Sequence, residues 1–325
     1  MKKVNLPDIL DESYKPGVKK KILTISDHPL SPSGVGTQTK YVIEALLETG
    51  RYQVVSLGGA IKHNSYEPTR VSPHENDWII YPVDNYGTHD IVRSIMRTEK
   101  PDMLWFMTDP RFYGWLWEIE NEIRANIPMV YYHVWDNYPY PTFNKRFYDS
   151  NDSIVSISKV TNDIVANVSP DVDLYHIPHA VSDVFKPYTD KEIDEFIIKT
   201  LASSPNYHRD KFSVFWNNRN ARRKQSGTLI WWFKEFLDII GHENACLFMH
   251  TDPKDYNGQD LHAIITELGL TNGEVMISNA KVPPQSLAMM YNVCNCTVNI
   301  SDAEGFGLAT LESLACGTPI IVNMT

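Results

Sequence analysis

The 325-residue sequence has no apolar run near the length of about 20 residues that a membrane-spanning helix requires. The N-terminus, which begins Met-Lys-Lys-Val-Asn-Leu-Pro-Asp, lacks the apolar core of a signal peptide. Cysteine is scarce, and its spacing does not suggest a disulfide framework: the four residues are Cys246, Cys294, Cys296 and Cys316. We therefore expect a cytoplasmic protein with reduced thiols and at most peripheral contact with a membrane.

The sequence also lacks an excess of basic residues. Its 30 lysines and arginines are outnumbered by 40 aspartates and glutamates, and the formal net charge is −10. This balance argues against sequence-independent nucleic-acid binding, which depends on neutralising phosphates. The hydrophobic content of 42% and charged content of 22% are typical of a folded protein, and the length is sufficient for two domains.

Short apolar runs alternate with helix-like segments along most of the chain, which predicts parallel sheets joined by helical crossovers. In the first half we expect strands at residues 20–25, 53–57, 78–81, 103–107, 129–134, 153–157 and 174–177, and helices at 37–48, 90–97, 112–124 and 160–168. In the second half we expect strands at 212–216, 246–250, 275–278, 297–300 and 320–322, and helices at 228–239, 261–268, 284–291 and after Gly307.

This pattern predicts an α/β fold with two Rossmann-like domains. We place the N-terminal domain at residues 1–187, a polar linker at 188–210 and the C-terminal domain at 211–325. A doubly wound sheet would usually continue beyond the strand at 320–322, so we expect the second domain to be incomplete. Ligands of such folds bind beyond the carboxyl ends of the strands, which directs attention to the loops that follow them.

The most informative of these loops is Ser301-Asp-Ala-Glu-Gly-Phe-Gly-Leu308, which precedes a helix that carries Glu312. Two carboxylates around a flexible backbone at a helix start would suit a polyhydroxylated ligand with a phosphate beside it. Taken alone, Glu304 could instead complement the helix dipole, and Glu312 could be a solvated surface charge. The flanking Leu-Ala-Cys-Gly-Thr-Pro segment favours the ligand site.

A basic cluster lies between the strand at 212–216 and the next helix, in the segment Arg219-Asn-Ala-Arg-Arg-Lys224. Four cations at a strand-to-helix junction would suit a diphosphate, although a solvated charge run is an equal alternative when the cluster is judged alone. Gly34 and Gly36 lie in the loop after the first strand, where they would let the backbone approach a phosphate or sugar or would simply form a turn. His133 ends another strand, and a buried histidine is its simpler interpretation.

Together these motifs resemble the retaining GT-B glycosyltransferases of the "group 1" family, glycosyltransferase family four. The family hallmark is a Glu, seven residues and a second Glu in a Glu-Gly-Phe-Gly setting, and Glu304 and Glu312 have that spacing. The resemblance implies that Glu304 and the backbone of Gly305, Phe306, Gly307 and Leu308 address the donor sugar. It also implies that Glu312 accepts hydrogen bonds from the ribose.

The resemblance extends to the basic cluster and the N-terminal domain. It implies that residues 1–187 form the acceptor-side domain and residues 211–325 the nucleotide-sugar donor domain. Arg219 and Lys224 have the spacing of the Arg-plus-Lys pair that neutralises the leaving diphosphate, so neither a cofactor nor a metal is expected. Gly34 and Gly36 match the family's glycine loop, which lies across the interdomain cleft from the donor phosphates. His133 corresponds to a histidine near the donor sugar and the acceptor, and Asp136 corresponds more loosely to its partner.

The implied activity is transfer of a sugar from a nucleoside-diphosphate-sugar to a hydroxyl of a glycan, lipid-linked or protein acceptor, with retention of configuration. The alternatives are a non-catalytic nucleotide-sugar or glycan-binding protein, or an inactive fragment of such an enzyme. A dinucleotide-dependent oxidoreductase is disfavoured because Thr39 replaces the third glycine of its motif. The Asp171-Val-Asp173 and His176-Ile-Pro-His179 segments are poor candidates for metal sites.

Overall fold

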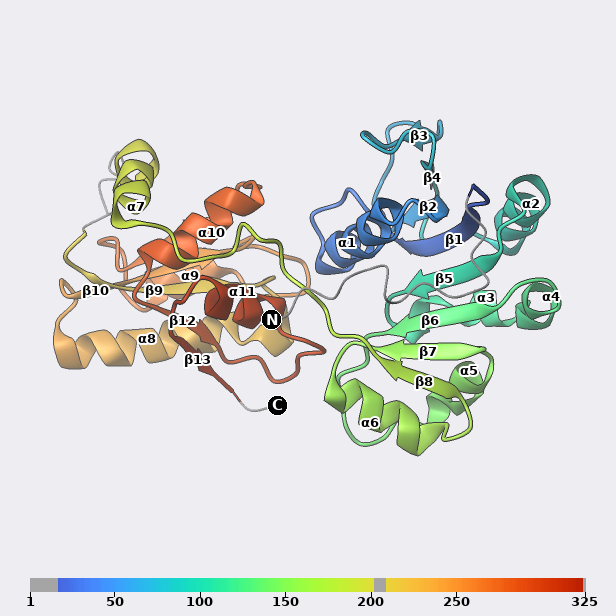
Figure 1. The fold of residues 1–325 in the computed structure, drawn as a ribbon. Helices are drawn as coiled ribbons and strands as arrows, with labels where there is room; N and C mark the ends of the chain where they lie inside the picture. The colour runs from blue at the N-terminus through green and yellow to red at the C-terminus, as the bar shows by residue number, and fades with distance from the viewer. Residues whose placement is uncertain (1–16, 202–208, 324–325) are drawn as a thin grey trace. The chain divides into compact units, whose positions relative to one another are not determined.

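A computed structural model describes residues 17–201 and 209–323 of the chain. It contains two compact units that divide between Ala180 and Val181. Each unit is an α/β structure with one sheet (Figure 1). Within the described residues, none of the helices is both long enough and apolar enough to cross a membrane.

The N-terminal unit is built on an eight-stranded sheet in the order β3-β4-β2-β1-β5-β6-β7-β8. All neighbouring strands are parallel except the short β3, which pairs antiparallel with β4 at one edge. The strands are β1 (Lys20–Asp27), β2 (Tyr52–Gly59), β3 (Thr69–Arg70), β4 (Trp78–Pro82), β5 (Met103–Met107), β6 (Met129–His133), β7 (Ser153–Ser156) and β8 (Asp173–His176).

Helices pack on both faces of this sheet, as expected for parallel strands whose side chains are buried on both sides. On one face, α1 (Gly34–Glu48) packs Ile43 and Leu47 against a small apolar cluster. A larger core lies under the helices that connect β4 through β8. These helices are α2 (His89–Glu99), η2 (Pro110–Phe112), α3 (Gly114–Trp117), α4 (Glu120–Arg124), η3 (Thr142–Asn144), α5 (Lys145–Asp149) and α6 (Lys159–Val168).

The C-terminal unit has a five-stranded parallel sheet in the order β11-β10-β9-β12-β13. Its strands are β9 (Phe212–Asn217), β10 (Ala245–His250), β11 (Val275–Ser278), β12 (Cys296–Asn299) and β13 (Ile320–Val322). The helices are α7 (Asp190–Phe196), the π-helix η4 (Ile197–Leu201), the 3₁₀ turn η5 (Arg222–Lys224), α8 (Ser226–Ile240), α9 (Leu261–Glu267), α10 (Pro284–Val293) and α11 (Leu308–Ala315).

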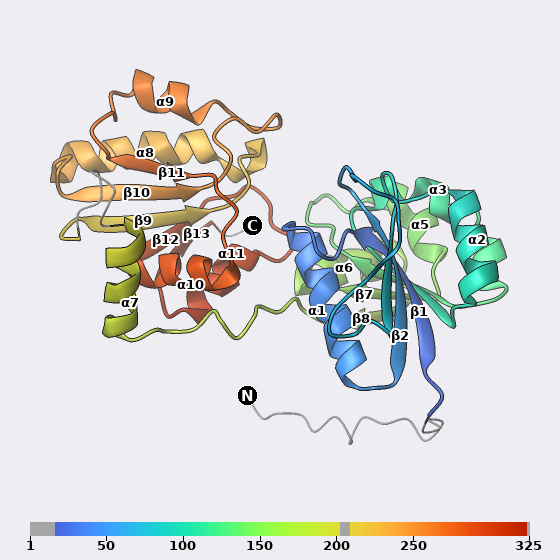
Figure 2. The ribbon, with the colours of Figure 1, turned by 90° about the horizontal axis from the view of Figure 1, so that it is seen from above.

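Alternation along β9 divides the C-terminal core into two layers. Val214 and Trp216 pack in the cluster that includes α8 and α9, while Phe215 between them packs in the cluster that includes α10. This is the period of two expected for a strand with both faces covered. Figure 2 shows α8 and α9 on one side of the sheet and α10 and α11 on the other. The helices of both layers cover the faces of the sheet, and the connecting loops lie at the carboxyl ends of its strands.

The predicted elements occur in the predicted order, and the structure adds β3, η3, α5 and η5, which were not predicted. Three other predictions differ in detail. The expected helix at 112–124 is three short pieces, because Tyr113 and Ile119 adopt non-helical backbone angles. The helix expected from residue 37 begins at Gly34, since the Ser33 side chain caps it by accepting from Gly36 N at 2.9 Å. The segment at 181–187, which we assigned to the first domain, joins the C-terminal unit because Phe185 packs there against Phe215 and Tyr291.

Candidate donor site in the C-terminal unit

Two loops at the carboxyl edge of the C-terminal sheet are joined to each other. One follows β9 and contains η5, and the other follows β12 and leads into α11. The backbone N–H of Asp302 donates to the carbonyl of Arg223 at 2.8 Å, and the Gln225 amide donates to the Asp302 carboxylate at 2.7 Å. The basic cluster and the first glutamate, which are 80 residues apart in the sequence, therefore lie side by side.

Lys224 and Glu304 form a charge-assisted hydrogen bond at the centre of this arrangement. The Lys224 side chain is only 8% exposed and that of Glu304 only 18% exposed. Asn299 and Ser301 also donate to Glu304 Oε1, at 3.2 and 2.9 Å. Burial by itself would raise the pKa of Glu304, but Lys224 and the two hydrogen bonds outweigh it and hold that pKa below its usual value. Glu304 is therefore a fixed carboxylate rather than a surface charge.

The second cation beside Glu304 is Arg223. Its Nη1 donates to the carbonyl of Ala303 at 2.5 Å and lies 3.8 Å from Glu304 Oε2. Arg219 instead makes a bidentate pair with Asp255, at 2.6 and 3.1 Å, and its own side chain is 65% exposed. Of the predicted Arg-plus-Lys pair, the structure thus brings Lys224 to Glu304 and holds Arg219 at a different carboxylate.

The segment Gly305-Phe306-Gly307 leads directly into the first turn of α11. Gly307 adopts φ = 78°, a left-handed conformation that strains any residue with a Cβ. It precedes Leu308, the first residue of the helix, and no side chain hydrogen-bonds to this helix start. The first N–H groups of a helix lack internal acceptors and bind anions well. The glycine loop therefore presents an uncapped helix N-terminus next to Glu304.

Glu312 lies one turn further along α11, in a separate polar cluster. Its carboxylate accepts from the Tyr291 hydroxyl at 2.7 Å and from Asn217 Nδ2 at 3.3 Å. Asn217 is the last residue of β9, and it also donates to the Tyr291 hydroxyl at 3.0 Å. Burial raises the pKa of Glu312 to about 7, although both hydrogen bonds oppose the shift. The carboxyl group can therefore change charge near neutral pH.

In the N-terminal unit, Gly34 and Gly36 form the first turn of α1. A Cβ on Gly36 would lie 2.4 Å from Ser31 Oγ and 2.7 Å from the carbonyl oxygen of His28. Glycine at position 36 is thus required by the close approach of the preceding loop to the helix start. This packing explains Gly36 without a ligand, and it keeps the loop after β1 folded against the helix.

His133 lies inside the N-terminal core, where it is completely buried. Its Nε2 is 2.8 Å from the Tyr148 hydroxyl, and Nδ1 has no hydrogen-bond partner among the described residues. Burial lowers the pKa of His133 to about 3, so the ring is neutral. The structure therefore supports the simpler interpretation of this residue, a core histidine. Asp136, three residues later, accepts from Asn137 at 2.8 Å in the loop after β6.

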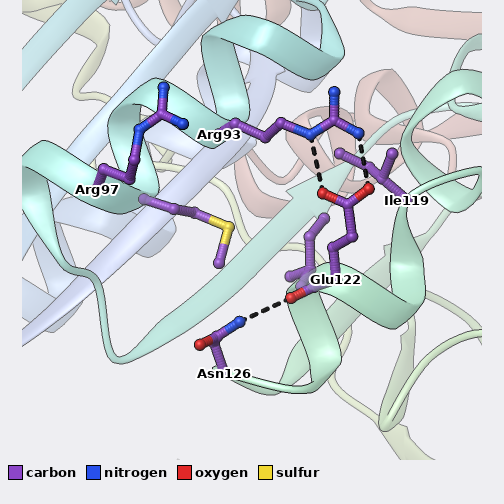
Figure 3. Close-up of a pocket in the computed structure, with 7 residues that line it drawn as sticks. Arg93, Arg97, Ile119, Glu122 and Asn126 are labelled. Carbon is purple, nitrogen blue, oxygen red and sulfur yellow. Dashed lines mark hydrogen bonds and ion pairs between the residues drawn. The ribbon is translucent and has the colours of Figure 1, made fainter.

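A hollow of about 210 Å³ lies elsewhere on the N-terminal unit. It is lined by side chains of α2 and the α4 region, among them Arg93 and Glu122, which form a bidentate ion pair at 2.8 and 2.6 Å (Figure 3). None of the predicted site residues lines it. The ion pair spans two helices that pack on the same sheet face, and we interpret it as a structural contact.

Several residues of the C-terminal site were not predicted from the sequence. Asn217, Tyr291, Asn299 and Ser301 hold the two glutamates, and Arg223 rather than Arg219 lies beside Glu304. Asn217 and Asn299 each end a strand, which is a usable signal in a parallel sheet. Tyr291 lies in the apolar pattern of α10 and gives no sequence signal of a polar role.

Part of the C-terminal unit is similar in sequence to known proteins. Residues 237–325 match the sequence model of the family described as glycosyl transferases group 1. The C-terminal unit thus resembles this family. A 61-residue stretch is 38% identical to the D-inositol 3-phosphate glycosyltransferase of Acidothermus cellulolyticus. That match covers 19% of this chain and only 13% of the length of the relative.

Solved structures show the fold over nearly the whole chain. Sucrose-phosphate synthase from Thermosynechococcus elongatus superposes with a TM-score of 0.73 at 18% identity, covering 94% of this chain and 81% of that one. HepE from Anabaena, solved in complex with UDP-glucose, gives a TM-score of 0.68 at 14% identity, with 93% and 80% covered. The two Rossmann-like units thus form the GT-B fold that the sequence predicts.

Proposed function

We propose that the protein transfers a sugar from a nucleoside-diphosphate-sugar to an acceptor hydroxyl with retention of configuration, and that the C-terminal unit binds the donor. The observation that carries the proposal is the Lys224–Glu304 pair beside the uncapped start of α11. A diphosphate is the anion that two cations and a helix N-terminus would hold together. The family match of residues 237–325 and the UDP-glucose complex of HepE support this assignment.

In this proposal the protein contributes positioning and electrostatic stabilisation. Lys224 and Arg223 stabilise the charge that develops on the departing diphosphate, and the first N–H groups of α11 share it. Glu304 orients the donor sugar, while Glu312 accepts hydrogen bonds from the ribose in its ionised form. Fixing the donor in this way aligns its anomeric carbon with an acceptor, which is where most of the rate enhancement would arise.

The proposal includes no protein nucleophile and no metal. In this proposal the two cations beside Glu304 neutralise the phosphates of the donor, so the reaction requires no divalent ion. We therefore expect donor turnover to persist in the presence of EDTA. A loss of turnover that added Mg²⁺ or Mn²⁺ restores would contradict this part of the proposal.

The test is a screen of UDP-, GDP- and ADP-sugars for thermal stabilisation and for donor turnover. A donor present at 100 times its Kd should stabilise the folded protein by about 2.7 kcal/mol. Glu304→Gln should lower turnover by roughly 10²- to 10³-fold, and it should weaken stabilisation by the same donor. If a donor binds but is neither transferred nor hydrolysed by the wild type, the protein is a nucleotide-sugar-binding protein and the enzymatic proposal is wrong.

A further inference from the structure

The outer face of α8 in the C-terminal unit carries a group of large apolar side chains. α8 lies along one side of the five-stranded sheet (Figure 2), and its inward side chains pack into the core. Its outward side chains include Trp231, Trp232, Phe236 and Ile239, which are 55%, 53%, 37% and 83% exposed; we call these four the α8 patch. Single exposed apolar residues are normal, but a group of this kind on one helix marks an interaction surface.

The residues of the α8 patch lie along one stripe of the helix. Trp232 is four residues before Phe236 and seven before Ile239, and these spacings place side chains on the same helix face. Trp231 lies beside the stripe, and its indole N–H donates to Glu235 at 3.1 Å. Consecutive helix residues project about 100° apart, so the two indoles diverge and do not form one flat platform for a sugar ring. The stripe is instead suited to packing against another helix.

The charges of α8 argue against a membrane as the occupant of the patch. Lys234 is the one cation of the helix, and it donates to Asp238 at 2.6 Å. Glu235 and Asp238 give the outer face an excess of negative charge. Docking to an anionic membrane surface depends on basic residues beside the apolar ones. A protein surface is therefore the better match.

The exposed area of the α8 patch agrees with the needs of a dimer. A whole aromatic side chain has about 150 to 250 Å² of surface, so the four partly exposed residues together present roughly 400 to 500 Å². A stable interface buries about 800 Å² on each partner. Lys234, Glu235 and Asp238 border the patch and would supply part of the remainder, which gives the usual apolar centre with a polar rim.

We propose that the α8 patch is the interface of a homodimer, in which α8 packs antiparallel against α8 of a second copy. A two-fold interface requires a surface that is complementary to itself. The antiparallel arrangement brings the two tryptophans of one helix against Phe236 and Ile239 of the other, so broad rings meet narrower side chains. It also opposes the two helix dipoles and brings Lys234 towards the acidic residues of the second copy. The inference uses none of the donor-site residues and is independent of the proposed function.

The experiment measures the mass of the full chain by sedimentation equilibrium from about 1 to 100 µM. We expect the mass to rise with concentration to twice the 37.3 kDa of one chain. Trp232→Glu and Ile239→Glu should each weaken the dimer about 100-fold, because both copies then place a charge in an apolar interface. The matched control is Ile198→Glu, which changes an exposed isoleucine of η4 in the same unit and should leave the dimer unchanged.

Oxidative footprinting shows where the copies meet. Trp231 and Trp232 should be oxidised more slowly at the highest concentration than at the lowest. The substituted side chains are exposed, so both glutamate variants should keep the wild-type circular dichroism spectrum, and loss of the dimer then reports on the interface.

Three outcomes would overturn the inference. The first is a wild-type chain that stays monomeric over the whole concentration range. The second is a dimer that both glutamate variants retain, which would place the interface elsewhere. The third is Trp232-dependent binding to phosphatidylcholine vesicles without self-association, which would make the patch a membrane contact.

Discussion

The two units present opposite chemistry at equivalent positions, the loops beyond the carboxyl ends of their parallel strands. In the C-terminal unit these loops carry a buried Lys224–Glu304 pair, and Glu312 lies nearby on the helix that follows them. In the N-terminal unit the loop after β6 carries exposed aromatic rings, and His133 is buried and neutral. The same architecture thus offers a charged edge in one unit and an aromatic edge in the other.

Under the proposed function, the charged edge of the C-terminal unit suits the donor. A nucleoside-diphosphate-sugar brings at least two negative charges, which require cations and helix N–H groups. The predictions below change residues of one edge or the other.

The largest effect is expected at Glu304. Glu304→Gln leaves the buried Lys224 without its charge partner, which should lower the free energy of unfolding by about 3 kcal/mol. Donor turnover should fall by roughly 10²- to 10³-fold. Urea unfolding and donor turnover measure the two effects. The matched control is Glu195→Gln, which removes an exposed partner of Lys191 on α7 and should leave both quantities unchanged.

Glu312 should make the stability of the protein depend on pH. Its folded pKa of about 7 lies above the ordinary carboxyl value of 4.5, so the folded state binds the proton more tightly than the unfolded state does. Stability contributed by this proton is present below pH 4.5 and is lost as pH rises through 7, by about 3 kcal/mol in all. Urea unfolding from pH 5 to 8 should show this slope in the wild type and a reduced slope in Glu312→Gln.

Donor affinity should change with pH in the opposite direction. Ribose hydroxyls donate hydrogen bonds best to an ionised carboxylate, so the donor should bind more tightly at pH 8 than at pH 6. Equal affinity at the two pH values, or the same pH dependence in Glu312→Gln, would remove Glu312 from the proposed ribose site.

Substitution of Gly36 tests whether this glycine, in the first turn of α1, is required for packing or for ligand binding. Gly36→Ala should cost about 2 kcal/mol of stability, because its Cβ would meet Ser31 Oγ and the backbone of His28. Gly114→Ala is the matched control, since a Cβ there meets no atom within 4 Å, and it should be neutral or slightly stabilising. If Gly36→Ala leaves stability intact but abolishes donor binding, the glycine serves the ligand instead.

The smallest effects separate the two arginines of the basic cluster. Arg223→Ala should weaken donor affinity about tenfold, since a charge-assisted contact to phosphate is lost. Arg219→Ala should change it by less than about threefold, because Arg219 is paired with Asp255 and largely exposed. Titration of both variants with the same donor measures the difference. A larger loss of donor affinity in Arg219→Ala than in Arg223→Ala would support the pair of Arg219 and Lys224 that the sequence spacing suggested.

The element order and the sheet-edge location of the site could be predicted from the sequence, because apolar periodicity and the position of loops after strands are local features. Glu304 and Glu312 were singled out by the spacing and residues of their motif, which are also local features. Whether Arg219 or Arg223 lies beside Glu304 depends on how the loop that carries Ala303 and Glu304, 80 residues later, folds against the basic cluster. The spacing of residues within the cluster does not contain this information. The buried position of His133 depends on Tyr148 and Asn144, which lie in the short η3–α5 segment that the apolar pattern did not reveal.

Lys224 gives the most direct test of the central claim that the charged edge of the C-terminal unit holds the donor diphosphate. The measurement is donor turnover by Lys224→Ala, compared with Lys234→Ala, which removes a lysine paired with Asp238 on the exposed side of α8. We predict that Lys224→Ala loses roughly 10²- to 10³-fold in turnover while remaining folded at the assay temperature, and that Lys234→Ala matches the wild type. A folded Lys224→Ala variant with turnover equal to that of Lys234→Ala would contradict the account.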